Sequence, residues 1–403
     1  MSTGRASVAN DGTSPMTPDQ LDEVIRGWLG GPGAETAAPA AVAAMTDENV
    51  AALLERIDFQ GVAGLVSAGL PGSAPLPDRL VRGLRSRLVE AEMREAEHAE
   101  TLKRALTALS VAGIEPLILK GTGLAYRHYE HPAQRIRGDT DLLVARAEFD
   151  RAVRVLKEIG GEAYPMPAGL KEATARHVLF HSQLGMVEEI DLHFGLSGNA
   201  VLRGLFPYEA LANTAVPLPE LSPEARVVSD VEMLLITAMH RLKHRQSVYY
   251  VNGVKYLSID RMIWAKDIDL LARNLSWAGW GGLLDRARET GLSGAVLSGL
   301  KAAENTFGTP VPKDILQILD GREPGRASTF LTSGVLGQVW MNLMATPGFN
   351  RKLRFLKDLV LPPADRMREA FADVRPSWLP WLYLYRAGRG MGVLVRRYAE
   401  GSP

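Results

Sequence analysis

The sequence predicts an α+β protein in which a short strand-containing core lies between two helical regions. Brief apolar runs with the length of strands gather between residues 113 and 200, whereas the flanking regions carry apolar residues at helical spacing. Glycine and proline clusters separate the segments. We therefore expect a disordered N-terminus over residues 1–16, an N-terminal helical segment over 17–112, the core over 113–200 and a C-terminal helical domain over 201–403.

Composition restricts the class of protein. The 46 basic and 46 acidic side chains balance, so the chain lacks the strong positive charge expected of a protein that binds long nucleic acid. The absence of cysteine excludes disulfides, thiol catalysis and cysteine-ligated zinc. The first residues do not resemble a secretory signal, and no apolar run approaches the ~20 residues of a membrane span. We therefore expect a cytoplasmic protein with no membrane partner.

The N-terminal segment is predicted to form four helices. Thr17 and Pro18 are a start signal for the first, and Gly113 is a stop signal after the last. The last helix carries a strongly charged stretch over residues 90–95, so part of it should face solvent. Helices are expected over 19–29, 47–57, 60–68 and 78–111.

Short strands and two helices make up the core, and helices make up the C-terminal domain. Strands are expected over 117–119, 139–144, 176–182 and 186–193, and core helices over 124–129 and 148–159. C-terminal helices are expected over 224–245, 255–273, 283–290, 295–305 and 314–319, with a polar loop over 246–253. The tail over 362–398 contains Trp378 and Trp381 among prolines and arginines, and we expect its aromatic side chains to pack onto the helical core rather than to form a membrane or nucleic-acid surface.

Two aspartates at the start of the strand over 139–144 are the main candidates for chemistry. Asp139 and Asp141 point to one face of the strand while Thr140 points to the other. Carboxylates this close repel each other unless a cation lies between them, and their hard oxygen atoms suit Mg²⁺ or Mn²⁺. An alternative interpretation is that both aspartates only cap a turn at the strand entrance.

The stretch around this pair resembles a known superfamily. It contains Leu119-Lys120-Gly121, Tyr129, then Asp139-Thr140-Asp141-Leu142-Leu143-Val144, and further on Asp191-Leu192-His193. It is similar to the nucleotidyltransferase superfamily that includes DNA polymerase beta, and most similar to an uncharacterised bacterial branch of nucleotidyltransferase family proteins. The resemblance is strong from about residue 117 to 196 and traceable to the C-terminus. It implies a nucleotidyltransferase-type mixed β-sheet domain for the core.

The resemblance also implies an active site. Asp139, Asp141 and Asp191 would be the catalytic residues and the ligands of Mg²⁺ or Mn²⁺, with Asp191 helping to deprotonate the attacking hydroxyl. The alternative for Asp191 is a solvated acidic edge that includes Glu188 and Glu189.

The same resemblance assigns residues to the nucleoside triphosphate. Gly121 and Thr122 would form the turn that receives its phosphates, and Lys120 would add a positive charge beside them. Arg137 is assigned to nucleotide binding, and Arg135 either clamps a phosphate or is merely solvated.

Four further side chains have open interpretations. His193 is interpreted as a hydrogen-bonded core histidine and not as a ligand. His240 and His244 have a spacing that binds zinc, but Arg241 occupies the position of the metalloprotease glutamate, so a basic helix face is favoured. His240 and Asp260 either line the nucleotide or acceptor side of the cleft, or Asp260 ties two helices together.

The predicted function is Mg²⁺-dependent transfer of a nucleoside monophosphate from a nucleoside triphosphate to a hydroxyl of a small-molecule or protein acceptor, with release of pyrophosphate. The alternative is a nucleotidyltransferase-fold binding module that has lost catalysis and serves in a biosynthetic or toxin–antitoxin-like assembly.

Overall fold

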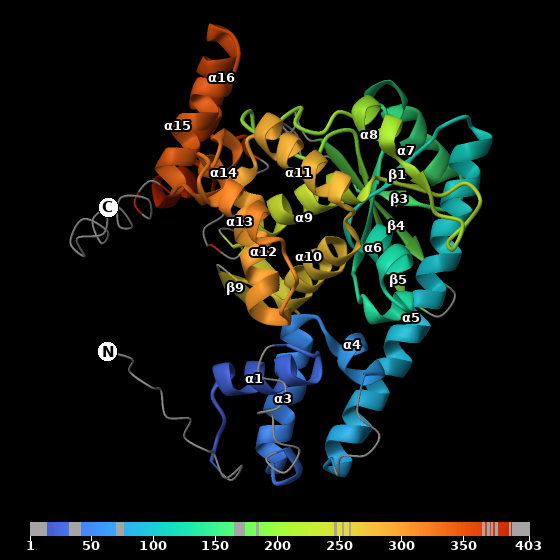
Figure 1. Ribbon diagram of the computed structural model, residues 1–403. Helices are drawn as coiled ribbons and strands as arrows, with labels where there is room; N and C mark the ends of the chain where they lie inside the picture. Colours follow the sequence, from blue (N-terminus) through green and yellow to red (C-terminus); the bar gives the residue numbers. More distant parts are fainter. Residues whose placement is uncertain are drawn as a thin grey trace, which may run out of the picture.

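The computed structural model describes most of the chain. The described residues are 14–31, 42–69, 76–164, 174–182, 185–245, 248–251, 254–257, 259–364, 367–368, 371, 374, 378–386 and 388. Most of the N-terminus predicted to be disordered lies outside them. In Figure 1 the N-terminal helices lie below, the β-sheet and the C-terminal helices lie above them, and one long helix, α5, runs from the first group to the sheet.

The N-terminal region is helical, as predicted. Thr17 starts the first helix through a reciprocal pair of hydrogen bonds with Gln20, and Gly61 ends the second in the left-handed conformation. The helices are α1 (Pro18–Trp28), α3 (Asp47–Gln60), α4 (Ala63–Ala68) and α5 (Asp78–Val111).

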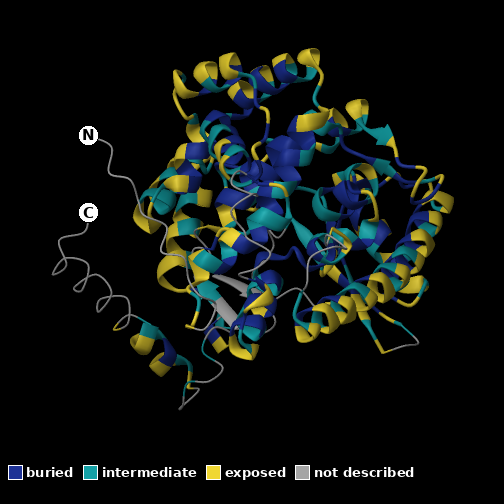
Figure 2. Ribbon diagram, turned by 60° about the horizontal axis from the view of Figure 1, so that its bottom comes forward, coloured by how far each residue is buried: buried dark blue, intermediate teal, exposed yellow. Residues whose placement is uncertain are grey.

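Helix α5 contains 34 residues and packs against the N-terminal helices at its start and against α7 (Phe149–Glu158) and the sheet towards its end. At its start Leu80 and Leu84 are buried, and towards its end Leu102 and Leu106 are buried. Between them Glu90, Glu92 and Arg94 are exposed, so part of the charged stretch faces solvent as predicted, whereas Ala91 is buried and Glu95 is partly buried. Figure 2 shows buried positions gathered inside the molecule and exposed ones on its outer side.

The core contains a seven-stranded mixed sheet with the order β3-β4-β5-β2-β1-β7-β6. Strand β2 pairs in parallel with β5, and their register places Asp141 opposite Asp191. The strands are β1 (Leu117–Ile118), β2 (Asp139–Leu143), β3 (Glu162–Ala163), β4 (Ala175–His181), β5 (Val187–His193), β6 (Val216–Pro217) and β7 (Arg226–Val227). The mixed sheet predicted by the family resemblance is therefore confirmed.

Short helices connect these strands. Helix α6 begins directly after β1, because Leu119 is extended and Lys120 turns the chain into the helix. The connecting helices are α6 (Lys120–His128), η2 (Pro132–Gln134), η3 (Arg146–Glu148), α7 (Phe149–Glu158) and α8 (Tyr208–Thr214). Helix α6 therefore starts four residues earlier than predicted.

Three predicted helix starts in the C-terminal region are wrong, and one of these helices, expected over 283–290, begins at Trp277. The helix expected over 224–245 begins at Asp230, because Arg226 and Val227 form strand β7, in which Val227 pairs with Ile118. The helix expected over 255–273 begins at Met262, because the residues before it form a hairpin of β8 (Val248–Val251) and β9 (Val254–Leu257), part of which was predicted to be a polar loop. The sheet thus extends beyond residue 200, and the domain boundaries stay a prediction.

The remaining C-terminal elements are helices. They are α9 (Asp230–His244), α10 (Met262–Asn274), α11 (Trp277–Thr290), α12 (Ser293–Phe307), α13 (Lys313–Asp320), α14 (Arg326–Thr332), α15 (Val335–Ala345) and α16 (Phe349–Val360). The last three were not predicted. In the tail Leu382 is buried, but Trp378 is 67% exposed, so the predicted packing of the tail aromatics is wrong for this side chain.

Candidate active site

The acidic side chains gather on one face of the sheet at the junction of β2 and β5. Asp139 and Asp141 are two residues apart on β2, and Asp191 lies beside Asp141 on β5. The ligand atoms of Asp141, Asp191 and His193 all lie within 4.8 Å of one another. Asp139 lies at the exposed start of β2, outside this cluster. The structure therefore brings the three predicted carboxylates onto one face, with His193 among them.

Lys120 neutralises Asp141. Its ammonium donates to Oδ1 of Asp141 at 2.6 Å. Burial of Lys120 opposes its charged form, but the charge and hydrogen bond of Asp141, together with the charges of Asp139 and Asp191, outweigh burial and raise the pKa of Lys120 above its ordinary value. Burial of Asp141 is likewise outweighed, because Lys120 and a 2.9 Å hydrogen bond with His193 hold the pKa of Asp141 well below its usual range.

The backbone of Lys120 is strained. With φ of 47° it is, within the described residues, the one residue other than glycine that has a positive φ. Such a conformation costs about 1–3 kcal/mol and persists where surrounding contacts enforce it. Here the strained turn starts α6 and directs the ammonium group towards Asp141.

Asp139 differs from the other two carboxylates because no hydrogen bond or ion pair joins it to any of the described residues. Its side chain is exposed at the start of the strand, yet the surrounding protein partly desolvates its carboxylate. This desolvation and the negative charge of Asp141 raise the pKa of Asp139 to about 7. Asp139 is thus the one carboxylate of the three that lacks a cationic protein partner.

Asp191 has a cationic partner in His177 on β4. The ring nitrogen Nδ1 of His177 forms an ion pair with Oδ1 of Asp191. The same nitrogen lies 2.6 Å from a carboxylate oxygen of Glu189. These contacts with Asp191 and Glu189 raise the pKa of His177 to about 10. The alternative of a merely solvated acidic edge does not fit Asp191, which is mostly buried.

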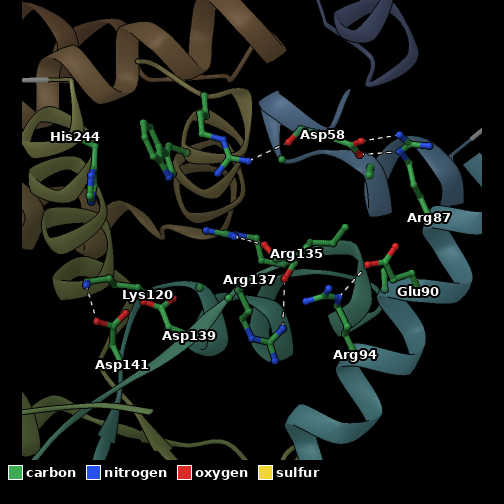
Figure 3. A pocket seen from close by; sticks show the side chains of 18 of the residues that line it. Asp58, Arg87, Glu90, Arg94, Lys120, Arg135, Arg137, Asp139, Asp141 and His244 are labelled. Atoms are coloured by element: carbon green, nitrogen blue, oxygen red, sulfur yellow. Dashed lines mark hydrogen bonds and ion pairs between the residues drawn. The ribbon is translucent and has the colours of Figure 1, made fainter. Parts of the chain in front are cut away.

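A cleft of about 640 Å³ opens in front of Asp139 and Asp141. Lys120, Gly121, Asp139 and Asp141 line one side, while α5 contributes Arg94 and four neighbours on the other (Figure 3). Residues of α3, α4, α9 and α10 complete the wall. The long helix α5 therefore borders the cleft and does not close it. This volume is typical of a small-molecule site.

Three of the arginines at the cleft are held by carboxylates. Arg137, which was predicted to bind the nucleotide, makes two hydrogen bonds with Glu95 at 2.6 and 3.0 Å and is almost fully buried. Arg135 makes two 2.8 Å hydrogen bonds with Asp267 of α10. Arg87 is paired with Asp58 in the same way. These guanidinium groups connect elements of the wall.

Arg94 is different. It makes one 3.2 Å contact, with Glu90 one turn earlier on α5, and both side chains are more than half exposed. Figure 3 shows this pair facing the cleft across from Asp139. Sequence reasoning missed Arg94, although the charged stretch inside an otherwise apolar helical pattern was a usable indication.

Thr122 faces away from the cleft. Its hydroxyl lies 2.9 Å from that of Thr140, on the opposite face of β2 from the aspartates, and accepts from Nε of Arg137. His98 of α5 connects Thr140 to Glu188, whose carboxylate lies 2.6 Å from Nδ1 of His98. This buried network, which sequence reasoning also missed, fastens α5 and α6 to the sheet.

The N-terminus of α6 remains suited to an anion. No side chain caps it, and Gly121 in its first turn lines the cleft. The amide groups of the first helical turn have no acceptor within the helix, and the helix dipole adds partial positive charge there. Thr122 can contribute its backbone amide to such a site while its hydroxyl is engaged elsewhere.

His240 and His244 of α9 line the cleft next to Trp264 of α10. Burial lowers the pKa of His240 well below its ordinary value and that of His244 to about 4, so both rings are neutral at pH 7. The rings of His244 and Trp264 are stacked. Asp260 accepts from Arg241, which supports its interpretation as a partner tying two segments together.

The residues around Asp141 fit a divalent cation. Nδ1 of His193 is buried and makes no hydrogen bond to the described residues, so it retains a lone pair for a ligand, whereas Oδ1 of Asp191 is paired with His177. Together with Asp141 they form a compact donor set of carboxylate oxygen and imidazole nitrogen. A cation bound by Asp141 would share this carboxylate with the ammonium of Lys120, which contacts Oδ1.

Carboxylates on adjacent strands, beside an uncapped helix N-terminus and an open cleft, form the kind of site that nucleotidyltransferases use. The model of a family described as uncharacterised nucleotidyltransferase matches residues 46–308, and the chain belongs to this family. The matched part extends from α3 into α12 and so includes the whole acidic cluster and Arg94. A comparison with curated proteins found no match.

Proposed function

We propose that the protein transfers a nucleoside monophosphate from a nucleoside triphosphate to a hydroxyl group of an acceptor and releases pyrophosphate. The observation that carries this proposal is the position of Asp139, Asp141 and Asp191 on one face of β2 and β5, where Asp139 and Asp141 line the cleft and Asp191 lies beside Asp141. Family membership supports the same reaction class.

The three carboxylates have separate roles in this proposal. Asp139, Asp141 and Asp191 hold Mg²⁺ or Mn²⁺, which when bound would neutralise phosphate charge. Asp191 also orients the attacking hydroxyl and helps to remove its proton. His193 keeps Asp141 ionised through their hydrogen bond.

Positive groups around the cleft would bind the triphosphate. The first-turn amides of α6 at Gly121 and Thr122 point towards an incoming anion. Lys120 would exchange Asp141 for a phosphate oxygen when a metal takes up the carboxylate. In place of Arg137, whose guanidinium is engaged by Glu95, we assign phosphate contact to Arg94.

The side of the cleft formed by His240, His244 and Trp264 would receive the nucleobase. His240 and His244 carry no charge at pH 7 and present flat rings backed by Trp264. Flat rings suit a nucleobase, because stacking on an aromatic side chain contributes about 1–3 kcal/mol for a base in nucleic-acid complexes.

A label-transfer experiment tests the reaction. The protein would be incubated with Mg²⁺, NTPs labelled at the α-phosphate and fractionated small molecules or proteins from cells. We expect label in one acceptor fraction and equimolar pyrophosphate, both lost in Asp141→Asn. Release of labelled nucleotide without any labelled acceptor would instead indicate a hydrolase.

One observation favours a second candidate, a binding module without catalysis. Lys120 and His177 already neutralise Asp141 and Asp191 by ion pairs. A module that uses these internal ion pairs permanently would bind nucleotide equally well with and without Mg²⁺, whereas the proposed enzyme needs the metal.

A further inference from the structure

Helices α15 and α16 form a helical pair that projects from the rest of the molecule (Figure 1). We call residues 335–360 the projecting pair. On α15 the side chains of Leu336, Trp340 and Met344 follow each other at intervals of four residues and are all exposed, Trp340 by 61%. The opposite side of α15 is anchored, because the buried side chain of Asn342 accepts from the backbone amide of Val201. The apolar side is therefore turned outwards.

Helix α16 carries a second outward apolar stripe. Its apolar residues at spacings of three and four are Phe349, Leu353, Leu356 and Val360, and all four are exposed, Phe349 by 79%. Within α16 no residue is buried. A large contiguous patch of exposed apolar side chains typically marks a site that binds a protein or a membrane.

Positive charges border the stripe on α16. The helix has four basic side chains and one acidic one, Asp358, whereas α15 has no charged residue. At 100° per residue, Lys352 and Lys357 lie on the two sides of the apolar stripe, and Arg351 and Arg354 lie farther round. Long basic side chains at the borders of an apolar helix face can reach past it to anionic groups.

The tail contacts the end of α16. Residues 379–386 are helical, and the guanidinium of Arg386 donates to the carbonyl oxygens of Leu359 and Val360 at the end of α16. The neighbouring side chains of Trp378 and Leu384 are exposed. The surface thus combines an apolar stripe, a basic border and tryptophan.

We propose that the projecting pair binds the surface of an anionic lipid bilayer, with its apolar side chains below the headgroups and Lys352 and Lys357 among them. Tryptophan, apolar stripe and lysine border are the features of helices that lie in this interface. A second copy of the chain fits less well, because joining two α16 stripes would bring like-charged lysines together without an acidic partner on α15.

Interfacial binding does not require a membrane span. No helix in the described part of the chain combines the length and the hydropathy needed to cross a membrane. The expectation that the protein has no membrane partner rested on that same lack of a long apolar run. A helix of 12 residues that lies in the bilayer surface is compatible with it.

Co-sedimentation of the full-length chain with vesicles tests the proposal. We expect binding to vesicles that contain phosphatidylglycerol, weaker binding to pure phosphatidylcholine, and a decrease as salt rises. Lys352→Glu/Lys357→Glu should weaken binding to the anionic vesicles by about 30-fold or more, since each basic group near such a surface contributes roughly fivefold. Phe349→Ser/Leu353→Ser should weaken binding to both kinds of vesicle.

Trp277→Ser is the matched control, because Trp277 is 69% exposed but lies on α11, away from the projecting pair. It should bind vesicles like the wild type. Sedimentation velocity without lipid distinguishes self-association. The proposal is overturned if the wild type does not bind anionic vesicles, if the control loses as much binding as the two double variants, or if Phe349→Ser/Leu353→Ser converts a dimer into a monomer without changing lipid binding.

Discussion

Arg94 and Arg137 provide the sharpest prediction, because both line the same cleft but Arg94 is exposed whereas Arg137 is buried in an ion pair. Arg94 is 58% exposed and, among the described residues, its one ion pair is with the similarly exposed Glu90, so removing it leaves no buried charge behind. A hydrogen bond from a charged donor contributes about 1.5–3 kcal/mol, and exposure places Arg94 at the low end. We therefore expect Arg94→Ala to weaken Mg²⁺-dependent binding of a non-hydrolysable NTP by about tenfold without changing stability.

Arg137→Ala should act on folding instead. The guanidinium is 5% exposed and its partner Glu95 is 11% exposed, so the change leaves a buried carboxylate without its cation, at a cost of about 3–5 kcal/mol. Thermal unfolding measures this loss. Arg85→Ala is the control for Arg94, since Arg85 is an exposed arginine of α5 that does not line the cleft. Equal affinities of Arg94→Ala and Arg85→Ala, with binding lost only in a still-folded Arg137→Ala, would refute the reasoning.

Three further predictions concern stability. Because the pKa of Asp139 is raised to about 7, the folded state binds its proton more tightly than the unfolded state, and stability falls as pH rises from about 4 through 7. Asp139→Asn should therefore be more stable than the wild type at pH 8 but hardly so at pH 4, which thermal unfolding in the presence of a chelator measures. Equal gains in stability at both pH values would contradict this. Asp267→Ala leaves the mostly buried Arg135 without its carboxylate and should lower the free energy of unfolding by about 3–5 kcal/mol in urea titrations; a loss below 1 kcal/mol would show that the pair is dispensable. A Cβ at Gly64 would lie 2.5 Å from a backbone oxygen of η2, so Gly64→Ala should destabilise by about 1–3 kcal/mol, whereas Gly281→Ala, which meets nothing within 4 Å, should stabilise slightly; the reverse order would refute the packing argument.

Local patterns were sufficient for the elements with strong periodicity. Helix α5 was predicted with its observed bounds, because its start follows proline, its end precedes glycine and its apolar residues recur at helical spacing. The acidic pair of β2 was found because strand alternation places Asp139 and Asp141 on one face whatever the rest of the fold does.

Non-local contacts explain what was missed. Strand β7 is two residues long and exists because Val227 pairs with Ile118, so no local pattern marks it. Both Arg94 and Arg137 line the cleft, but Arg137 is engaged by Glu95, which α5 brings beside it from a distant part of the sequence. The same holds for the hydroxyl of Thr122, which the buried network turns away from the cleft.

Calorimetric titration of a panel of non-hydrolysable NTPs, with and without Mg²⁺, tests the central claim most directly. The wild type and Asp139→Asn/Asp141→Asn would be compared under the same conditions. We predict that the wild type binds at least one NTP only when Mg²⁺ is present, and that the double variant binds none. Binding that is equally tight without Mg²⁺, or that survives the double substitution, would contradict the proposal that these carboxylates hold a metal for nucleotidyl transfer.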